Sequence, residues 1–216
     1  RDLRMSRGLG DVYKRQDAWD MENRNSCERG TRIHADLENS FYKKKKDIDL
    51  SKYQIGGKFE CIKDYNNLDL ENGVYPEYLI SRVSEDGKLR IAGQIDLLVK
   101  RGNKIIIGDW KTNKKIETKS FFNSKTSVKM KYPLNNLDDV NYWHYALQLS
   151  TYAWMIQKKN PEFEIEDLVL VHFDHSDNMT VYHLPYLKDE VIRMLSFYKK
   201  ESILAENKKK RQRIEY

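Results

Sequence analysis

The sequence predicts an α/β fold in which helices flank a central mixed β-sheet. Three runs of alternating or apolar residues between 74 and 112 are separated by short polar turns, which is typical of a strand meander. Residues 138–159 then carry apolar side chains at helical spacing, and a further strand pair and a closing helix follow. The 216 residues are enough to bury one sizeable core.

The composition favours a globular chain with an acidic partner. Charged residues make up 33% of the sequence and the formal net charge is +6, which favours nucleic acid as that partner. No apolar run approaches the roughly 18 residues of a membrane span, so no membrane partner is expected. Cys27 and Cys61 lack a CxxC neighbour, which predicts free thiols and no iron–sulfur cluster.

The first residues differ in character from the rest. The stretch RDLRMSRGLGDVYKRQ has no initiator methionine and no clear period, and it resembles translated adapter sequence. We therefore expect residues 1–16 to be non-native or a disordered tail, and residues 17–216 to form a single domain. The other interpretation is a basic, flexible tail.

The first helix is predicted around Ile33 and Leu37, which recur at helical spacing, and Thr31 can cap its start. His34 and Glu38 are four residues apart, so they share a face of this helix next to the apolar one.

The middle of the chain predicts most of the sheet. Strands are expected at 74–84, 88–100 and 104–112, joined as an antiparallel meander. Residues 113–137 carry six lysines against one glutamate and have no period, which predicts a mobile, basic loop. A strong helix is expected at 138–159, before the final hairpin and the closing helix.

The third predicted strand ends on opposite charges, in the stretch IIIGDWKT. Because side chains alternate along a strand, Asp109 and Lys111 point to one face and Trp110 to the other. Pairing about a turn near Gly102 places Asp96, from the preceding strand, at the same end as Asp109.

Two carboxylates at a partly buried sheet end repel each other, so this arrangement calls for a cation. Mg²⁺ prefers carboxylate oxygens, and a lysine beside it can polarise a water or stabilise charge on a phosphate. These parts describe metal-assisted phosphodiester hydrolysis. Taken alone, Asp109 and Lys111 would more often be an ordinary surface ion pair, but their place after IIIG and the second acid at Asp96 argue against that.

The spacing Asp96, twelve residues, Asp109-x-Lys111 resembles the PD-(D/E)XK nuclease superfamily. His34 in GTRIH and the QxxxY pair in QLSTY resemble the outer motifs of its RecB-like exonuclease branch. The DWKT stretch is similar to that of phage-encoded members and of the mitochondrial genome maintenance exonuclease. The resemblance implies a restriction-endonuclease-like core, and Mg²⁺ or Mn²⁺ as cofactor.

The resemblance also assigns roles to residues. Asp96, Asp109 and Lys111 would be catalytic. His34, Asp96, Asp109 and the Trp110 carbonyl would bind the metal. The substrate would be held by Gln148, Tyr152, Thr112 and Tyr145, while Glu77 and Glu38 would have supporting roles. For Tyr145, packing in the core is the alternative. His172, Asp174 and His175 also carry metal-binding groups, but they fall at a predicted strand end and outside these motifs.

The function predicted is that of a divalent-metal-dependent DNA nuclease, most readily an exonuclease that acts on DNA ends and prefers single strands. Its expected place is the cytoplasm of a bacterial or phage-infected cell, and phage recombination, repair and defence are all open as its pathway. A structure-specific or restriction-type endonuclease is one alternative. A non-catalytic DNA-binding module is the other.

Overall fold

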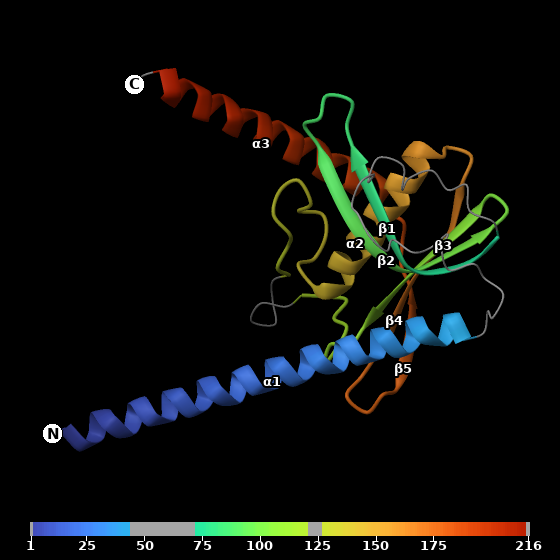
Figure 1. Cartoon of the computed structure of the whole chain (residues 1–216). Coiled ribbons are helices and arrows are strands. Elements are labelled where there is room, and N and C mark those ends of the chain that lie inside the picture. The colour runs from blue at the N-terminus through green and yellow to red at the C-terminus, as the bar shows by residue number, and fades with distance from the viewer. Residues whose placement is uncertain (1, 44–71, 121–126, 215–216) are drawn as a thin grey trace. The chain divides into compact units, whose positions relative to one another are not determined.

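The computed structural model describes residues 2–43, 72–120 and 127–214 of the chain (Figure 1). Contacts divide the chain into two units, Arg1–Lys44 and Lys45–Tyr216. Over the described ranges, the first unit holds one helix and the second holds a sheet with two helices. Every helix in these ranges falls short of the length or the apolar character that spans a lipid bilayer.

The first unit is the helix α1, which spans Asp2–Lys43. The helix predicted around Ile33 and Leu37 is therefore confirmed. Its predicted start at Thr31 is wrong, because the Thr31 hydroxyl lies within the helix and donates to the Cys27 carbonyl at 3.0 Å. Threonine can make such a bond to the preceding turn instead of capping a new helix.

Two further predictions concern the first residues of the chain and its two cysteines. The backbone of residues 2–16 belongs to α1, and the non-native origin of these residues remains a prediction. Cys27 is an exposed free thiol. Cys61 lies outside the described residues.

The second unit is built on a five-stranded sheet with the order β1-β2-β3-β4-β5. β3 and β4 run parallel, and all other neighbours run antiparallel, so the predicted mixed sheet is confirmed. The strands are β1 (Gly73–Val83), β2 (Arg90–Arg101), β3 (Lys104–Lys111), β4 (Glu164–Phe173) and β5 (Met179–His183).

The turn between β2 and β3 sets the register of this hairpin. Gly102 has a φ of +60°, which glycine adopts without steric cost, and its N–H donates to Asn72 Oδ1 at 2.6 Å. From this turn the ladder extends to the pair Leu97 and Gly108. The next residues along each strand toward the open end are Asp96 and Asp109, so the predicted proximity follows from the short turn.

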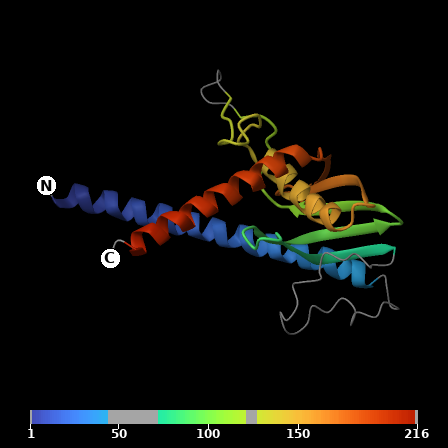
Figure 2. The same ribbon diagram turned by 90° about the horizontal axis from the view of Figure 1, so that it is seen from above.

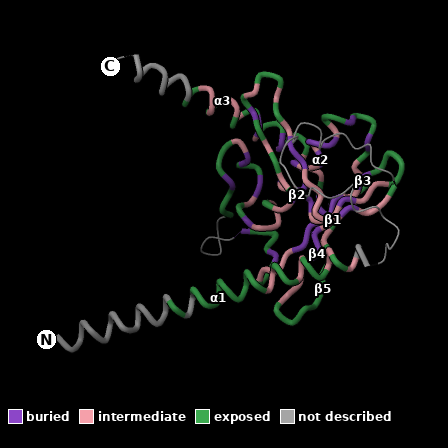
Figure 3. Tube along the Cα trace, in the orientation of Figure 1, coloured by how far each residue is buried: buried purple, intermediate pink, exposed green. Residues whose placement is uncertain are grey.

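Helix α2 (Asn141–Lys159) connects the parallel strands β3 and β4 and packs on the sheet (Figures 1 and 2). Its residues Ala146, Leu149, Ala153 and Ile156 recur at spacings of three and four, and all are fully buried. They pack with the apolar strand residues in the main core. Figure 3 shows the buried positions gathered in the strands and α2.

Helix α3 (Lys188–Ile214) packs against α2. Its buried Val191 and Leu195 join Leu147 of α2 in a second hydrophobic cluster. α2 is therefore covered on two sides, by the sheet and by α3.

The second cluster also includes part of the predicted mobile loop. Met130, Leu134 and Leu137 are buried in it, and the Met130 N–H donates to the Leu137 carbonyl at 3.0 Å. The prediction of a mobile loop is therefore wrong for residues 127–137. These apolar side chains are four and three residues apart, but they belong to a compact turn that is stabilised by α2 and α3, and not to a helix.

Asp138 holds this folded segment together. Its carboxylate accepts from Lys129 Nζ at 2.5 Å and Ser127 Oγ at 2.7 Å, and from the Ser120 N–H at 3.2 Å. These hydrogen bonds lower the pKa of Asp138 from 3.8 to about 2, and the bond from Lys129 has the largest effect. The folded protein therefore binds this proton less readily than the unfolded chain.

A pH-dependent contribution to stability follows from this lowered pKa. Asp138→Asn is expected to lower the thermal midpoint at neutral pH, because the carboxylate's bonds are lost. The difference from wild type should persist above about pH 4 and shrink as the pH falls toward about 2, where the wild-type carboxyl is protonated as well. Thermal unfolding of both proteins between pH 7 and pH 2 checks this. A difference that does not change with pH would contradict it, and Glu117→Gln serves as an exposed control.

Candidate active site

Asp109 and Lys111 lie together at the end of β3. Asp109 is only 2% exposed, and Lys111 Nζ forms an ion pair with its Oδ2. Lys111 Nζ also donates to the Trp110 carbonyl at 3.4 Å. Trp110 itself is buried, as its place on the opposite face of the strand predicts. The two charged side chains therefore share one face of the sheet.

Asp96 reaches the same place from β2. Its Oδ2 accepts the Trp110 N–H at 2.9 Å. In the antiparallel register it lies one step beyond the pair of Leu97 and Gly108, which places it across from Asp109. The two acids that the sequence suggested as partners are thus brought together by adjacent strands.

Glu77 adds a third carboxylate in the next strand. The β1–β2 ladder skips Glu77, which lies across from Asp96 and has a φ of +52°. A non-glycine residue rarely adopts this conformation, and such strain is often found at functional sites. Oxygens of Glu77 and Asp96 lie within 4.8 Å of each other, and Gln94 Nε2 donates to Glu77 Oε2 at 2.6 Å. Pro76 was the only sequence signal for this break in the strand.

A chain of contacts holds Lys111 from the other side. Its ammonium lies 5.1 Å from the centre of the Tyr145 ring. The Tyr145 hydroxyl accepts from Asn113 Nδ2 at 2.6 Å, and the Asn113 carbonyl accepts from His172 Nε2 at 2.7 Å. Sequence reasoning missed Asn113 and this role of His172. The β3–β4 register pairs His172 with Lys111, but the two are far apart in sequence.

Two residues of the other group of possible metal ligands, His172 and Asp174, make structural hydrogen bonds. His172 is buried and bonded to a backbone carbonyl. Asp174 Oδ1 accepts the N–H groups of Ser176 and Asn178 at 2.8 and 2.9 Å, which shapes the turn between β4 and β5.

Gln148 and Tyr152 lie on α2, above β2. Gln148 Nε2 donates to the Tyr152 hydroxyl at 3.2 Å. Burial raises the pKa of Tyr152, and the charges of Asp109 and Asp96 raise it further, so the phenol stays protonated at neutral pH. The ring lies against the backbone of Gly93, where a Cβ atom would come within 2.9 Å of the Tyr152 hydroxyl and closer still to the ring.

The remaining predicted residues are placed less completely. Thr112 directly follows Lys111 and is partly buried. His34 and Glu38 belong to α1, in the other unit of the chain. Their participation in the site remains a prediction.

The oxygen atoms of the site fit a hard divalent cation. Asp109 Oδ2 and the Trp110 carbonyl already converge on one positive charge, the Lys111 ammonium. Asp96 and Glu77 add carboxylate oxygens from the neighbouring strands. Carboxylate and carbonyl oxygens are the ligands that Mg²⁺ and similar ions prefer. A cation here would also relieve the repulsion among the acids.

Comparison with known proteins identifies the family. A model of the PD-(D/E)XK nuclease superfamily matches residues 11–214. Among curated proteins no match was found. Two crystal structures show a partial likeness. The first, the structure of SSO0001, is 20% identical to this chain with a TM-score of 0.36. The matched region covers 61% of this chain and 50% of the SSO0001 chain. The second, a candidate exonuclease from Eubacterium rectale, is 12% identical with a TM-score of 0.39. The matched region covers 78% of this chain and 52% of the Eubacterium rectale chain. The chain thus spans about half of each solved protein. Since the family model covers most of its length, the chain belongs to the PD-(D/E)XK nuclease superfamily.

Proposed function

We propose that this chain is a divalent-metal-dependent nuclease that hydrolyses phosphodiester bonds in DNA. The observation that carries the proposal is the buried Asp109, ion-paired with Lys111 at a strand end and faced by Asp96 from the next strand. Folding alone does not favour two acids that face each other from adjacent strands at a partly buried site. Family membership supplies the reaction that such a site serves.

Mg²⁺ or Mn²⁺ is the proposed cofactor, and PD-(D/E)XK nucleases use divalent metals. Asp96, Asp109 and the Trp110 carbonyl would hold the ion, with Glu77 close enough to contribute. We propose His34 as a further ligand from α1. The bound ion would supply positive charge beside the scissile phosphate.

The chain's own residues would position the reactants. The Lys111 ammonium would orient the attacking water and stabilise negative charge on the phosphate. Tyr145 would hold this ammonium in place through its ring. Gln148 and Tyr152 would bind the DNA backbone or a base next to the acids, with Thr112 near the scissile phosphate.

Within the superfamily, we propose an exonuclease of the RecB-like branch that prefers single-stranded ends. The motif order His34, Asp96, Asp109-x-Lys111 and the QxxxY pair supports this. The test is degradation of end-labelled single-stranded, linear duplex and closed circular DNA with Mg²⁺ or Mn²⁺. Loss of linear DNA with intact circles is expected. Nicked circles would indicate an endonuclease instead, and DNA that is bound but never cut would contradict the proposal.

Gly93 tests whether Tyr152 must lie where it does. Gly93→Ala is expected to push the Tyr152 ring away from the acids, because the added Cβ collides with it. We expect kcat/KM for DNA cleavage to fall roughly 10- to 100-fold, as displacements near 1 Å can produce. Stability should fall by about 1–3 kcal/mol from overpacking, which leaves the protein folded.

The matched control is Ala92→Val, at the exposed neighbouring position of β2, whose side chain points to the opposite face. Cleavage rates of both variants measure the effect on activity, and circular dichroism checks that both remain folded. Equal activity of Gly93→Ala and wild type would contradict the assigned position of Tyr152.

A further inference from the structure

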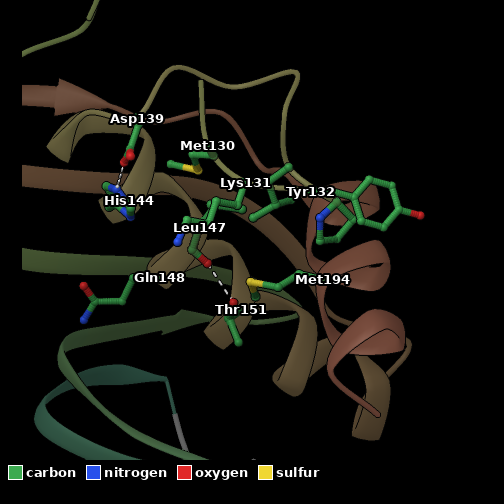
Figure 4. Close-up of a pocket in the computed structure, with 11 residues that line it drawn as sticks. Met130, Lys131, Tyr132, Asp139, His144, Leu147, Gln148, Thr151 and Met194 are labelled. Atoms are coloured by element: carbon green, nitrogen blue, oxygen red, sulfur yellow. Dashed lines mark hydrogen bonds and ion pairs between the residues drawn. The ribbon is translucent and has the colours of Figure 1, made fainter. Parts of the chain in front are cut away.

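An open pocket of about 580 Å³ lies next to the proposed site, between α2, α3 and the folded segment at 127–137 (Figure 4). Its walls are largely apolar and include Met130, Leu134, Leu147 and Met194. Methionine side chains adapt readily to the shape of a bound group. The volume falls in the range that small-molecule sites occupy.

One residue belongs to both the pocket and the site. Gln148 lines the pocket, while its amide donates to the Tyr152 hydroxyl beside the acids. Figure 4 shows this amide extending away from Met194. Gln148 and Thr151 both line the pocket from α2. A chemical group bound in the pocket would therefore lie next to a DNA strand that is held at Tyr152.

The rim of the pocket is polar and aromatic. Tyr132 is 72% exposed and makes an edge contact with Phe197, with ring centres 5.3 Å apart. Lys131 adds a positive charge, and His144 Nε2 shares an exposed hydrogen bond with Asp139 Oδ1 at 2.8 Å. An apolar interior with hydrogen-bonding groups and a cation at its edge suits a planar ring that is apolar on its faces, polar at its edge and attached to a phosphate chain.

We propose that this pocket receives an unstacked base of the DNA strand that is being cleaved. The inference rests on the proposed nuclease function and deepens it. The base would lie among Met130, Leu134 and Met194, with Tyr132 at the entrance and Gln148 between the base and the scissile phosphate. The enzyme would hold its substrate by a base as well as by its backbone, which favours single strands, whose bases are free to leave the stack.

The first test uses a single-stranded oligonucleotide with 2-aminopurine at one position at a time. It is bound to the full chain carrying Asp109→Asn, which prevents cleavage. At one position the fluorescence should rise several-fold, because the base leaves its stacked neighbours. Adding Met194→Phe, which fills the pocket, or Tyr132→Ala, which removes its rim, should abolish the rise. Tyr198→Ala, an exposed tyrosine of α3 outside the pocket, should leave it unchanged.

The second test uses wild-type protein and an oligonucleotide with one abasic residue at the position found above. Cleavage should slow roughly tenfold, in line with the usual effect of losing one stacked base. If wild type cleaves DNA but no position shows the fluorescence rise, or the abasic residue at that position does not slow cleavage, the pocket inference fails and the nuclease function stands. A fluorescence rise that survives both Met194→Phe and Tyr132→Ala also overturns it. If wild type cleaves no DNA at all, the proposed function fails, and the fluorescence series still decides whether the pocket binds a base.

Discussion

Replacing Asp109 by asparagine is expected to lower kcat/KM for metal-dependent DNA cleavage by at least roughly a thousandfold. Asp109 is the buried acid of the site, and its charge is directed at the point where the Trp110 carbonyl also converges. An amide keeps the shape but removes the charge that would hold the cation. Loss of several kcal/mol of transition-state stabilisation corresponds to a rate change of this size.

The same variant should lose its thermal response to metal. Wild-type protein with Mg²⁺ at about 100 times its Kd gains about 2.7 kcal/mol of stability, and Asp109→Asn should gain far less. The metal-free variant should remain folded, because the change relieves repulsion with Asp96. Lys111, whose side chain is 21% exposed, can turn toward water.

Asp167→Asn is the matched control for this experiment. Asp167 lies on β4, is partly exposed and pairs with His183 at 2.7 Å, away from the proposed ligands. It should cleave DNA and respond to Mg²⁺ as wild type does. Full cleavage by Asp109→Asn, or an unchanged thermal response to Mg²⁺, would rule out Asp109 as a metal ligand.

The neighbourhood of Asp96, Asp109 and Lys111 was predictable because it depends on short-range rules. Alternation along a strand places Asp109 and Lys111 on one face. A two-residue turn that includes Gly102 determines which residues of β2 and β3 are neighbours, and the structure has this register. Local chain geometry therefore suffices for this part of the site.

The support around Lys111 was not predictable in the same way. His172 reaches it through the parallel pairing of β3 and β4, whose register contains an irregularity between Ile105 and Ile106. The connection runs through the whole of α2, so no turn specifies which residues pair. Asn113, which links Tyr145 to His172, follows the strand in a segment without any period.

The backbone conformation of Glu77 is a third feature that could not be predicted from the sequence. The family resemblance assigned it a supporting role, but its left-handed backbone conformation depends on the surrounding sheet. Residues 127–137 were misread for a related reason. Their lysines suggested a solvated loop, while Met130, Leu134 and Leu137 find their partners only on α2 and α3.

Replacing Lys111 by methionine should lower kcat roughly 10²- to 10³-fold, the usual cost of losing one electrostatic stabiliser of a transition state. The side chain keeps its length and loses its charge. DNA affinity, measured with Ca²⁺ in place of Mg²⁺, should change much less, because Lys111 contributes one charge among many to binding.

Lys111→Arg should remain well below wild type in kcat, since a guanidinium is wider and differently hydrated than an ammonium. Tyr145→Leu should cost about 2- to 30-fold, the range of a cation–π contact, and Tyr145→Phe less.

The order of these effects distinguishes a catalytic lysine from a structural one. Lys104→Met, at the other end of the same strand, removes an exposed lysine paired with Glu166 at 3.4 Å and should leave kcat unchanged. If the Lys111 ion pair only stabilised the fold, Lys111→Met would lower the thermal midpoint and leave kcat intact. If Lys111 acts on the phosphate, kcat falls while the fold persists. Tyr145→Leu then lies between wild type and Lys111→Met, because it loosens the ammonium without removing it. Wild-type activity in Lys111→Met would exclude the proposed role.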